Sequence, residues 1–559
     1  MSENMLRESS AELNESENDE EYFYSSEDQI ERLEKKEKQN CCRTWLKCLS
    51  LTSIILSLLA LIVVAIIGFA ILPYIWGYRS WEYKLMKYGK IWQHFMNPEN
   101  PTVVKIFIYQ VDNYKKFYKN TTGHPSVYTR GPFVYRKHRS ILTANINQEK
   151  DTVTYKARTR YVFDDSRSNM SQNYKINTFN VPLLIILSLN STRPKGQTSA
   201  DGIFRDMEAF GSEQSLVLEN GISVRDFLFE GQPFCFPTEN IHARAMCNMV
   251  RSELVSKSHN SFFRIGGENT LLFSVLGSKH NSDEGEISLC LGSKSFTKKD
   301  TGFIKAINLK QELNAWLSYP DSTCNKIDGF YSFFPAVTKF YEEFYIFIPE
   351  LCSKFKFVRV KNYTRYTRYE VDINSLIGNE KGYQCHGTGT VKDIDDIYRL
   401  QLKRGATDLT KCLEGYPFIS TPPYFGLPDE YREQSFLVEK DIMDNQKWYL
   451  EIDYLNDTGV CIKMVVKIQY NLFIRHEEGI EVFQNLKKTV IVPIFWYEES
   501  LTYTYEQFEE SAQTMSDIYE KRADQLNLAR YIAIGICIFI VLLGCCMFLI
   551  HLCCNHCSL

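Results

Sequence analysis

The stretch Ile54-Ile-Leu-Ser-Leu-Leu-Ala-Leu-Ile-Val-Val-Ala-Ile-Ile67 is almost wholly aliphatic and lies within a run, residues 49–75, that contains no charged residue. A helix of ~20 apolar residues crosses the ~30 Å hydrocarbon core of a bilayer. The run therefore predicts a first transmembrane helix, with Pro73, Tyr74 and Trp76 at its interfacial end. A second apolar run, Tyr531–Leu552, predicts another transmembrane helix over residues 530–552.

The two predicted helices divide the chain into a tail of residues 1–48, a central region of residues 76–529 and a tail of residues 553–559. Two spans place both tails on the same side of the membrane. Lys and Arg are more frequent just before the first span than just after it, which favours the cytosol for both tails. The long segment before the first span argues against a cleaved signal peptide. Neither tail contains an acidic dileucine signal, so we expect the plasma membrane, with the lysosomal membrane as the alternative.

The central region has the features of a glycosylated, disulfide-bonded ectodomain. Five N-x-Ser/Thr acceptors fall within it: Asn120, Asn169, Asn190, Asn362 and Asn456. It also holds eight cysteines, at positions 235, 247, 290, 324, 352, 385, 412 and 461. An even number of cysteines outside the cytosol suggests disulfide bonds.

Composition and charge exclude several classes of protein. The net charge of −4 argues against a general nucleic-acid binder, which needs a basic surplus. Residues 1–40 carry thirteen acidic and five basic side chains, so we expect an acidic, disordered cytosolic tail. Aromatic residues make up 14 % of the chain, enough rigid apolar mass to build a large core or to line an interior.

Cysteines near the two spans are candidates for S-palmitoylation, because thiols at the cytosolic interface can meet an acyl donor. The candidates are Cys41, Cys42, Cys48, Cys553, Cys554 and Cys557, while Cys537, Cys545 and Cys546 are interpreted as ordinary membrane-helix residues. His551 and His556 accompany the C-terminal cysteines, but the spacing lacks a paired C-x-x-C frame, so no metal site is predicted. No cofactor is predicted either.

The apolar pattern of the central region predicts mostly strands. β-branched and aromatic runs indicate strands at 105–111, 131–136, 152–155, 344–348, 460–473 and 489–496. Helical spacing occurs at 181–189, among Phe204, Met207, Phe210 and Gly211, and among Val224, Phe227 and Leu228. Residues 506–528 predict a polar helix that leads into the second span. Because strands lie near both ends, we expect one continuous α+β domain.

Several of these segments together resemble the class B scavenger receptor family, which includes the fatty-acid translocase, the high-density-lipoprotein receptor and the lysosomal integral membrane protein. Tyr109–Asn113 and Gly131-Pro-Phe-Val-Tyr-Arg136 resemble its "F-N-x-T-N … G-P-Y-x-Y-R" start. Further matches follow in order: Arg225–Gly231, Asp328-Gly329 with Phe333-Phe-Pro335, Glu350-Leu-Cys352, Lys411–Pro417, Asn485–Lys488 and Val492–Trp496. Each motif alone is weak, whereas the ordered set and the two-span topology together are specific.

This resemblance implies an antiparallel β-barrel-like ectodomain with a helical apex bundle and an internal apolar tunnel, anchored by two transmembrane helices. It implies a cell-surface receptor that binds lipoproteins, fatty acids or cholesterol and transfers lipid to the membrane through the tunnel. Such an apolar tunnel suits a lipid because removing each CH₂ group of the lipid from water is favourable by ~0.8 kcal/mol. The alternatives within the family are a lysosomal lipid transporter or trafficking receptor and a sensory lipid co-receptor. The sequence is compatible with a homo-oligomer and does not decide the oligomeric state.

The resemblance also implies particular residues. Two disulfides carry over, Cys324–Cys385 and Cys352–Cys412, while Cys235–Cys247 and Cys290–Cys461 are guesses for the remaining cysteines. Candidates for ligand entry at the apex are Phe204, Met207, Phe210, Leu216, Leu218, Phe227 and Phe229, although any single one of them could simply pack the core. Residues 206–219 contain four carboxylates and no Lys, which argues against lysine-mediated capture of anionic lipid. Ser420-Thr-Pro-Pro-Tyr424 lacks the His of the family's "S-x-P-H-F".

Two other classes of protein share the two-span topology. An ecto-nucleotidase needs Gly-rich turns that cradle phosphate, and the best Gly cluster, His386-Gly-Thr-Gly-Thr390, does not lead into a clear helix. No Gly-x-Ser-x-Gly or His-Glu-x-x-His motif occurs, so an enzyme is not expected. A ligand-gated channel would present a polar or small-residue stripe on its pore helix, whereas Tyr531–Leu552 is aliphatic and Cys-rich.

Overall fold

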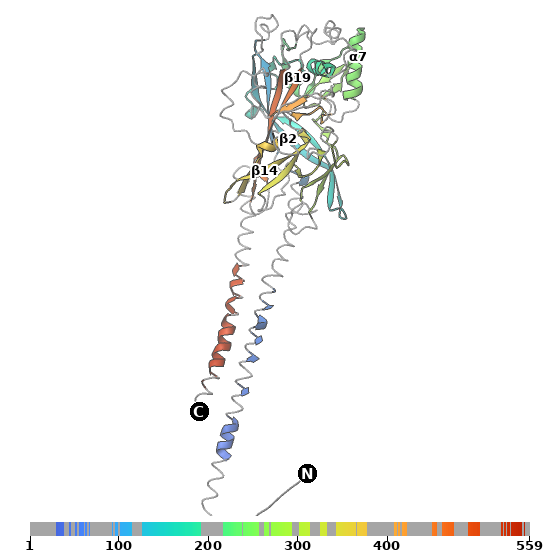
Figure 1. Ribbon diagram of the computed structural model, residues 1–559. Coiled ribbons are helices and arrows are strands. Elements are labelled where there is room, and N and C mark those ends of the chain that lie inside the picture. Colours follow the sequence, from blue (N-terminus) through green and yellow to red (C-terminus); the bar gives the residue numbers. More distant parts are fainter. Residues whose placement is uncertain are drawn as a thin grey trace, which may run out of the picture. The chain divides into compact units, whose positions relative to one another are not determined.

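Figure 1 shows the computed structural model of the chain. It describes residues 30–38, 101–113, 126–191, 216–237, 239–255, 262–267, 270–292, 301–313, 325–331, 342–364, 366–376, 450–455, 461–474, 490–502 and 538–550, with shorter pieces within 44–66, 92–98, 407–421, 527–536 and at 553. The chain divides into two compact units. Residues 79–513 form the large unit, and residues 1–78 together with 514–559 form the small unit.

The small unit contains a long apolar helix at its C-terminal end. Arg530–Ile550 has 21 residues and a mean hydropathy of 3.0, and within the described part of the chain it is the one helix long and apolar enough to cross a membrane. Large apolar side chains such as Phe539 and Leu549 are exposed on it, as expected of a lipid-facing helix. In the first predicted span, residues 49–75, the structure describes only scattered residues, so that span stays a prediction.

One large sheet dominates the large unit. Across it the strands follow the order β11 (Ile304–Ile307), β10 (Ile287–Cys290), β3 (Thr152–Phe163), β2 (Val127–Asn147), β1 (Thr102–Val111), β20 (Val490–Thr502), β19 (Cys461–Ile474), β18 (Glu451–Leu455), β15 (Tyr366–Val371), β14 (Ser353–Asn362), β13 (Glu343–Ile348) and β12 (Phe330–Tyr331). Short strand β9 (Ser282–Asp283) pairs with β3, and β17 (Phe418–Thr421) pairs with β19 and with β16 (Thr407–Asp408). Neighbours pair antiparallel except β12 and β13, which are parallel.

The two ends of this strand order meet along a short seam. Phe303 and Phe330 form an antiparallel bridge, and their rings lie 4.5 Å apart in an edge-to-face contact. Two backbone hydrogen bonds reinforce the seam: the amide of Ile304 donates to Gly329 O at 2.9 Å, and the amide of Tyr331 donates to Gly302 O at 3.2 Å. The sheet is therefore a nearly closed barrel, and the expectation of a mixed α+β fold built on a barrel-like sheet is confirmed.

Side chains alternate between the two faces of this barrel, as the pleat of a strand requires. On β1, Val104 and Ile106 are buried, and they lie opposite Tyr135 and Phe133 of β2. We call the face that carries these residues the inner face. On the outer face Lys105 pairs with Glu498 across β1 and β20 at 2.8 Å. The predicted strands at 105–111, 131–136 and 344–348 are confirmed within β1, β2 and β13, and β20 confirms the strand predicted at 489–496 from Val490 onward, since residue 489 lies outside the described residues.

Helical segments and two small sheets complete the large unit. Helix α5 (Val181–Ser191) confirms the predicted helix at 181–189 and contacts β19. Helix α7 (Ile241–Met249) continues into the π-helical segment η6 (Val250–Val255). A two-stranded sheet pairs β4 (Lys175–Ile176) with β5 (Ile222–Ser223), and a three-stranded sheet orders β6 (Gln232–Phe234), β8 (Leu271–Phe273) and β7 (Phe263–Ile265).

The segment around Phe227 differs from the expected helical spacing. Residues Asp226–Glu230 form the π-helical turn η5, in which the amide of Gly231 donates to Asp226 O at 2.8 Å, five residues back. Gly231 has φ +104°, a left-handed conformation that glycine adopts without strain, and it ends the turn. The wider turn still buries Phe227 and Leu228 on one side, and Phe229 lies next to them.

Two disulfides lie within the described residues. Cys352 joins Cys412, as the resemblance implies, and Cys235 joins Cys247, which agrees with one of the guesses. The guess that pairs Cys290 with Cys461 is wrong, because no disulfide joins them. Strands β3, β2, β1 and β20 separate β10 from β19, and a disulfide needs Cα atoms within about 7 Å. Cys324 and Cys385 lie outside the described residues.

Candidate functional site

The inner face of the barrel gathers aromatic and charged side chains from strands that are far apart in sequence. On β2 the residues Phe133, Tyr135, Lys137 and Arg139 occupy alternate positions and share this face. Buried aromatic side chains from other strands join them, namely Tyr155, Phe344, Phe357, Tyr369, Tyr454 and Tyr470. This enclosed set of residues is the candidate functional site, and we call it the interior.

An aromatic collar lies where η5 meets β2 and β3. The ring of Phe229 is 5.1 Å from Tyr135, 5.9 Å from Tyr161 and 5.3 Å from His280. The backbone amide of Tyr161 donates to His280 Nδ1 at 3.3 Å, so this nitrogen must be unprotonated in the fold. Burial also lowers the pKa of His280 below its usual value.

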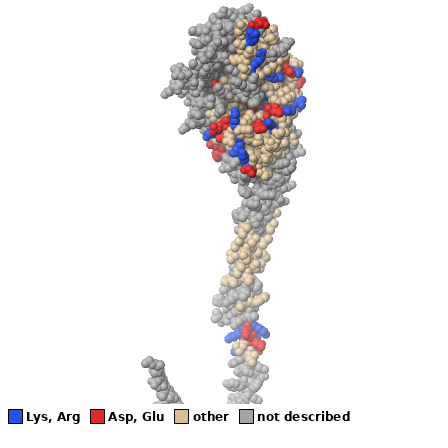
Figure 2. Space-filling model, turned by 90° about the vertical axis from the view of Figure 1, so that its right-hand side faces the viewer, with Lys and Arg blue, Asp and Glu red and all other residues tan. Residues whose placement is uncertain are grey.

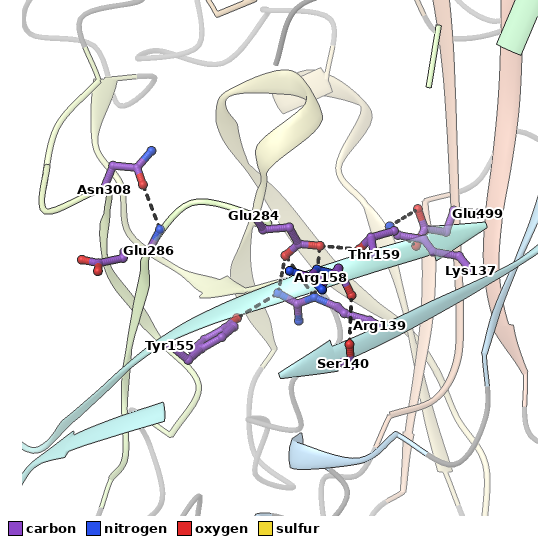
Figure 3. A network of polar contacts seen from close by, with 10 residues as sticks. All are labelled: Lys137, Arg139, Ser140, Tyr155, Arg158, Thr159, Glu284, Glu286, Asn308 and Glu499. Atoms are coloured by element: carbon purple, nitrogen blue, oxygen red, sulfur yellow. Dashed lines mark hydrogen bonds and ion pairs between the residues drawn. The ribbon is translucent and has the colours of Figure 1, made fainter. Parts of the chain in front are cut away.

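Two ion pairs lie beside the collar on the inner face (Figure 3). Lys137 Nζ donates to both carboxylate oxygens of Glu499, at 2.8 and 3.0 Å. Arg139 donates through Nε and Nη2 to Glu284, with the shortest distance at 2.7 Å. Thr159 Oγ1 donates to the second oxygen of Glu284 at 2.5 Å, and Arg139 Nη2 also donates to Tyr155 Oη at 3.3 Å. Each cation on this part of the inner face is thus neutralised by a carboxylate.

Electrostatics hold Glu284, Lys137 and Arg139 in their charged forms. Burial would raise the pKa of Glu284, but the Arg139 guanidinium and the hydrogen bond from Thr159 lower it to about 2. Burial would lower the pKa of Lys137, yet the carboxylates of Glu499 and Glu350 raise it above its usual range. Burial likewise opposes ionisation of Arg139, and Tyr155 and Glu284 outweigh it, so the pKa of Arg139 is raised as well.

Tyrosine hydroxyls line much of the interior, and burial keeps them protonated. Burial raises the pKa of Tyr135, Tyr155, Tyr161, Tyr331, Tyr454, Tyr470 and Tyr497. The hydroxyls of Tyr135 and Tyr454 are fully buried and find no hydrogen-bond partner among the residues that the structure describes. An unpaired buried hydroxyl is costly, and native structures satisfy most such groups with a partner, water or a ligand.

The region around Tyr454 is more apolar. Phe344 lies 4.7 Å from Tyr369 and 5.8 Å from Tyr454, with edge-to-face packing in both contacts. Phe357 stacks on Phe344 at 5.8 Å. Cys461 is buried close by, donates to Lys463 O at 3.4 Å, and burial raises the pKa of its thiol to about 12. This thiol is therefore unreactive at neutral pH.

The predicted apex residues do not form one group in the structure. Leu216, Leu218 and Phe227 are buried in the core, which is the ordinary role of large apolar residues. Among the apex candidates that the structure describes, Phe229 is the one that reaches the interior, because it belongs to the collar. Phe204, Met207 and Phe210 lie outside the described residues.

The predicted modification sites are only partly described. Asn169 and Asn362 are exposed, as glycan acceptors must be, and Asn190 lies in α5. Cys553 is exposed at the C-terminal end of the small unit. The remaining predicted sites, Asn120, Asn456, Cys41, Cys42, Cys48, Cys554 and Cys557, lie outside the described residues.

Sequence reasoning missed the charged residues of the interior. In the sequence, Lys137 and Arg139 follow a strand motif and look like solvated side chains. A signal was nevertheless present, because they continue the alternation of Phe133 and Tyr135 and must share their face if the strand is regular. Glu284 and Glu499 lie 145 and 362 residues from their partners in sequence, and no local pattern connects them.

Charges on the outside of the large unit are of mixed sign. Figure 2 shows Lys, Arg, Asp and Glu interspersed over the visible face, without a broad area of one sign. An outer cluster on β15, β18 and β19 is typical: Arg368 contacts Asp453 at 2.8 Å and Glu451 at 3.2 Å, and Lys463 contacts Glu451 at 2.6 Å. These pairs stabilise neighbouring strands on the outer face and do not extend into the interior.

Comparison with known proteins agrees with the family resemblance of the sequence. The CD36 family profile matches residues 54–555. Sensory neuron membrane protein 2 of Aedes aegypti is 23% identical over 490 residues, covering 78% of this chain and 87% of that protein. Sensory neuron membrane protein 2 of Drosophila melanogaster is 24% identical (73% and 81% covered), and sensory neuron membrane protein 1 of Apis mellifera is 23% identical (74% and 74%). The chain therefore belongs to the CD36 family, the family of the class B scavenger receptors.

Proposed function

We propose that this chain is a membrane-anchored, scavenger-receptor-like protein that binds lipid in the barrel interior and passes it to the membrane. The observation that carries the proposal is the interior itself, a nearly closed sheet whose inner face is rich in aromatic side chains. An apolar, enclosed surface suits a lipid because ~25 cal/mol is gained per Å² of apolar surface removed from water. Membership of the CD36 family favours a receptor over the ecto-nucleotidase and channel alternatives.

Residual exposure on the inner face supports the proposal. Arg139 and Glu284 keep 22% and 29% of their side-chain surface exposed, although both point to the same face as fully buried Phe133. Val466 and Tyr497 on the inner face are also only partly buried, unlike Ile468, which lies directly opposite Tyr497 in the sheet. Side chains that pack completely would leave no such surface.

Within the family, the names of the relatives favour a sensory lipid co-receptor over a lysosomal transporter. All of the relatives compared are called sensory neuron membrane proteins. The plasma membrane, with both termini in the cytosol, is the location that we propose on this basis. Fatty acids, cholesterol and lipoprotein particles stay predicted cargoes.

Uptake by cells tests the transfer step. Val466 and Val465 are adjacent on β19 and, because the strand alternates, Val466 faces the interior opposite Glu499 whereas Val465 faces outward. We expect cells that express the full chain to take up labelled fatty acid and lipoprotein cholesteryl ester faster than vector controls. Val466→Trp should reduce that gain by more than half, and Val465→Trp should retain it at equal surface expression. Unchanged uptake with Val466→Trp would show that lipid does not pass through the interior.

The topology and the glycans are tested separately. We propose that Asn169 and Asn362 carry glycans, since both are exposed on the large unit. Asn169→Gln and Asn362→Gln should each remove one glycosidase-sensitive increment of mass. If the wild-type chain shows no shift on glycosidase treatment, the large unit does not face the secretory lumen.

A further inference from the structure

Hydrogen bonds from other segments fix the backbone of the turn η5, which carries Phe229. The amides of residues 275–276 donate to the carbonyls of residues 227–228 at 3.1 and 2.7 Å. Arg264 Nη2, on β7, donates to Phe229 O at 2.7 Å and to Glu230 O at 2.6 Å. Turns of the π-helical kind are rare and are often found at functional sites. Four successive carbonyls of this turn thus have donors from outside it, and the backbone behind Phe229 cannot shift without breaking these bonds.

The side chain of Phe229 is less constrained than its backbone. Phe227, on the same turn, is fully buried, whereas Phe229 is only partly buried. The ring of Phe229 is in contact with the other three collar rings, with centroids 5.1 to 5.9 Å apart. Rings at these distances leave no space between them for a methylene chain. Rotation of the side chain takes the ring out of the collar and leaves the backbone hydrogen bonds of the turn intact.

The collar lies at a boundary on the inner face. On β2, Tyr135 lies between Phe133, which is fully buried, and Lys137, which keeps 15% of its side-chain surface exposed. Arg139, two positions further along the strand, keeps 22% exposed. An apolar chain that moves along β2 from the charged part of the interior to its buried apolar part therefore passes the ring of Phe229.

We infer that Phe229 is a specificity-determining residue of the interior: its ring swings aside for a single alkyl chain and holds back rigid, wider lipids such as sterols. Arg264 is its positioning residue, because it fixes the turn from which the ring projects. A flexible chain passes one methylene at a time, whereas a fused ring system separates several collar rings at once and loses their mutual contacts. This inference rests on the proposed function and names the shape of the lipid that passes fastest.

Uptake of two carboxylic acids that differ in the width of their apolar part tests the inference. The probes are radiolabelled hexadecanoate and cholesteryl hemisuccinate, delivered on albumin to cells that express the full chain. The rate in vector controls is subtracted from each measurement. We expect hexadecanoate to enter about fivefold faster than cholesteryl hemisuccinate, since the loss of one aromatic contact changes a rate by about that factor.

Variants at Phe229 should move the ratio of the two rates in opposite directions. Phe229→Ala should raise the rate for cholesteryl hemisuccinate about fivefold and change the rate for hexadecanoate less than about twofold. Phe229→Trp should lower the rate for cholesteryl hemisuccinate further. Arg264→Met should weaken the discrimination, and Arg264→Lys, which retains a donor for the carbonyls, should keep most of it. Phe163→Ala is the matched control, because its ring contacts Tyr135 at 5.3 Å from outside the collar, and it should keep the ratio of the unmodified chain.

The outcomes separate this inference from the function on which it rests. If neither probe enters faster than in vector controls, both proposals are overturned. If both probes enter the unmodified chain's cells equally fast, the inference is overturned while passage of lipid stands. If the ratio is the same in Phe229→Ala, Phe229→Trp and the unmodified chain, or if Phe163→Ala changes it as much as Phe229→Ala does, Phe229 is not the determinant. Where one Phe229 variant does not reach the cell surface, the other variant and the ratio on the unmodified chain decide the matter.

Discussion

The pair Arg139–Glu284 offers a quantitative test of how enclosed the interior is. Glu284→Gln removes the carboxylate charge and leaves the Arg139 guanidinium without its counter-charge on the inner face. The pKa of Glu284 falls from 4.5 to about 2. At 1.36 kcal/mol per pKa unit this corresponds to about 3 kcal/mol of net stabilisation of the charged carboxylate. We therefore expect Glu284→Gln to lower the free energy of unfolding by about 3 kcal/mol, in the range for breaking a buried ion pair.

A double-mutant cycle isolates the interaction from other effects of each substitution. Arg139→Met, Glu284→Gln and the double variant are unfolded with urea in detergent micelles, and tryptophan emission is followed. The double variant should be more stable than the sum of the single effects predicts, by about 2–3 kcal/mol. Because the pKa of Glu284 is lowered in the fold, this stabilisation is present above the unfolded value near 4.5 and is lost as the pH falls towards 2.

The control pair lies nearby but on the other face, with Arg158 on β3 and Asp283 on β9. Arg158 Nη2 contacts Asp283 at 2.7 Å, and the two side chains keep 47% and 50% of their surface exposed. Exposed pairs contribute about 0–1 kcal/mol, so the same cycle on Arg158 and Asp283 should give a coupling energy in that range. Equal coupling energies for the two pairs would refute the reasoning, because the inner face would then be as well screened by water as the outer face.

Three further predictions concern stability. His280→Asn keeps an acceptor for the amide of Tyr161. Because burial lowers the pKa of His280, the unfolded chain takes up a proton before the folded chain does, and the wild type should lose thermal stability between about pH 7 and pH 5. Melting scans of the variant should show a shallower loss over this range. Replacing Cys352 and Cys412 by Ala, with a sequence separation of 60, should cost about 4 kcal/mol in urea unfolding, and an unshifted midpoint would contradict this. Gly131→Ala places a Cβ 2.6 Å from a backbone oxygen at φ +143°, so stability should fall by about 1–3 kcal/mol, with melting temperature and surface expression as the readouts.

Local pattern was sufficient for the strands that build the inner face. The runs at 105–111 and 131–136 combine β-branched and aromatic residues with a regular alternation, so their pairing as β1 and β2 follows from burying one face. The sequence does not show which distant strands become neighbours. β1 pairs with β20, and β11 meets β12 at the seam, because of packing over the whole chain. The same limitation produced the wrong pairing of Cys290 with Cys461.

The candidate site was less predictable than the fold, for a physical reason. The apolar character of a residue is by itself a signal of burial, and Phe229 was predicted as a ligand-entry residue on that basis. Lys137, Arg139 and Glu284 are buried only because each finds a partner, and the partner comes from another strand. Burial of a charge is thus a property of the folded pair and cannot be assigned to either residue from its own surroundings in the sequence.

The pairing of β1 with β20 has a consequence for how the chain is made. Ser500 Oγ lies against Val103 O, and the two residues are separated by 397 positions. At a synthesis rate of about 5–20 residues per second, β1 emerges from the ribosome roughly 20–80 s before its partner strand exists. Throughout that interval Val104, Ile106 and Ile108 lack one of the two strands that bury them. Newly made chains should therefore depend on chaperones that shield an apolar strand until the last part of the large unit has been translated.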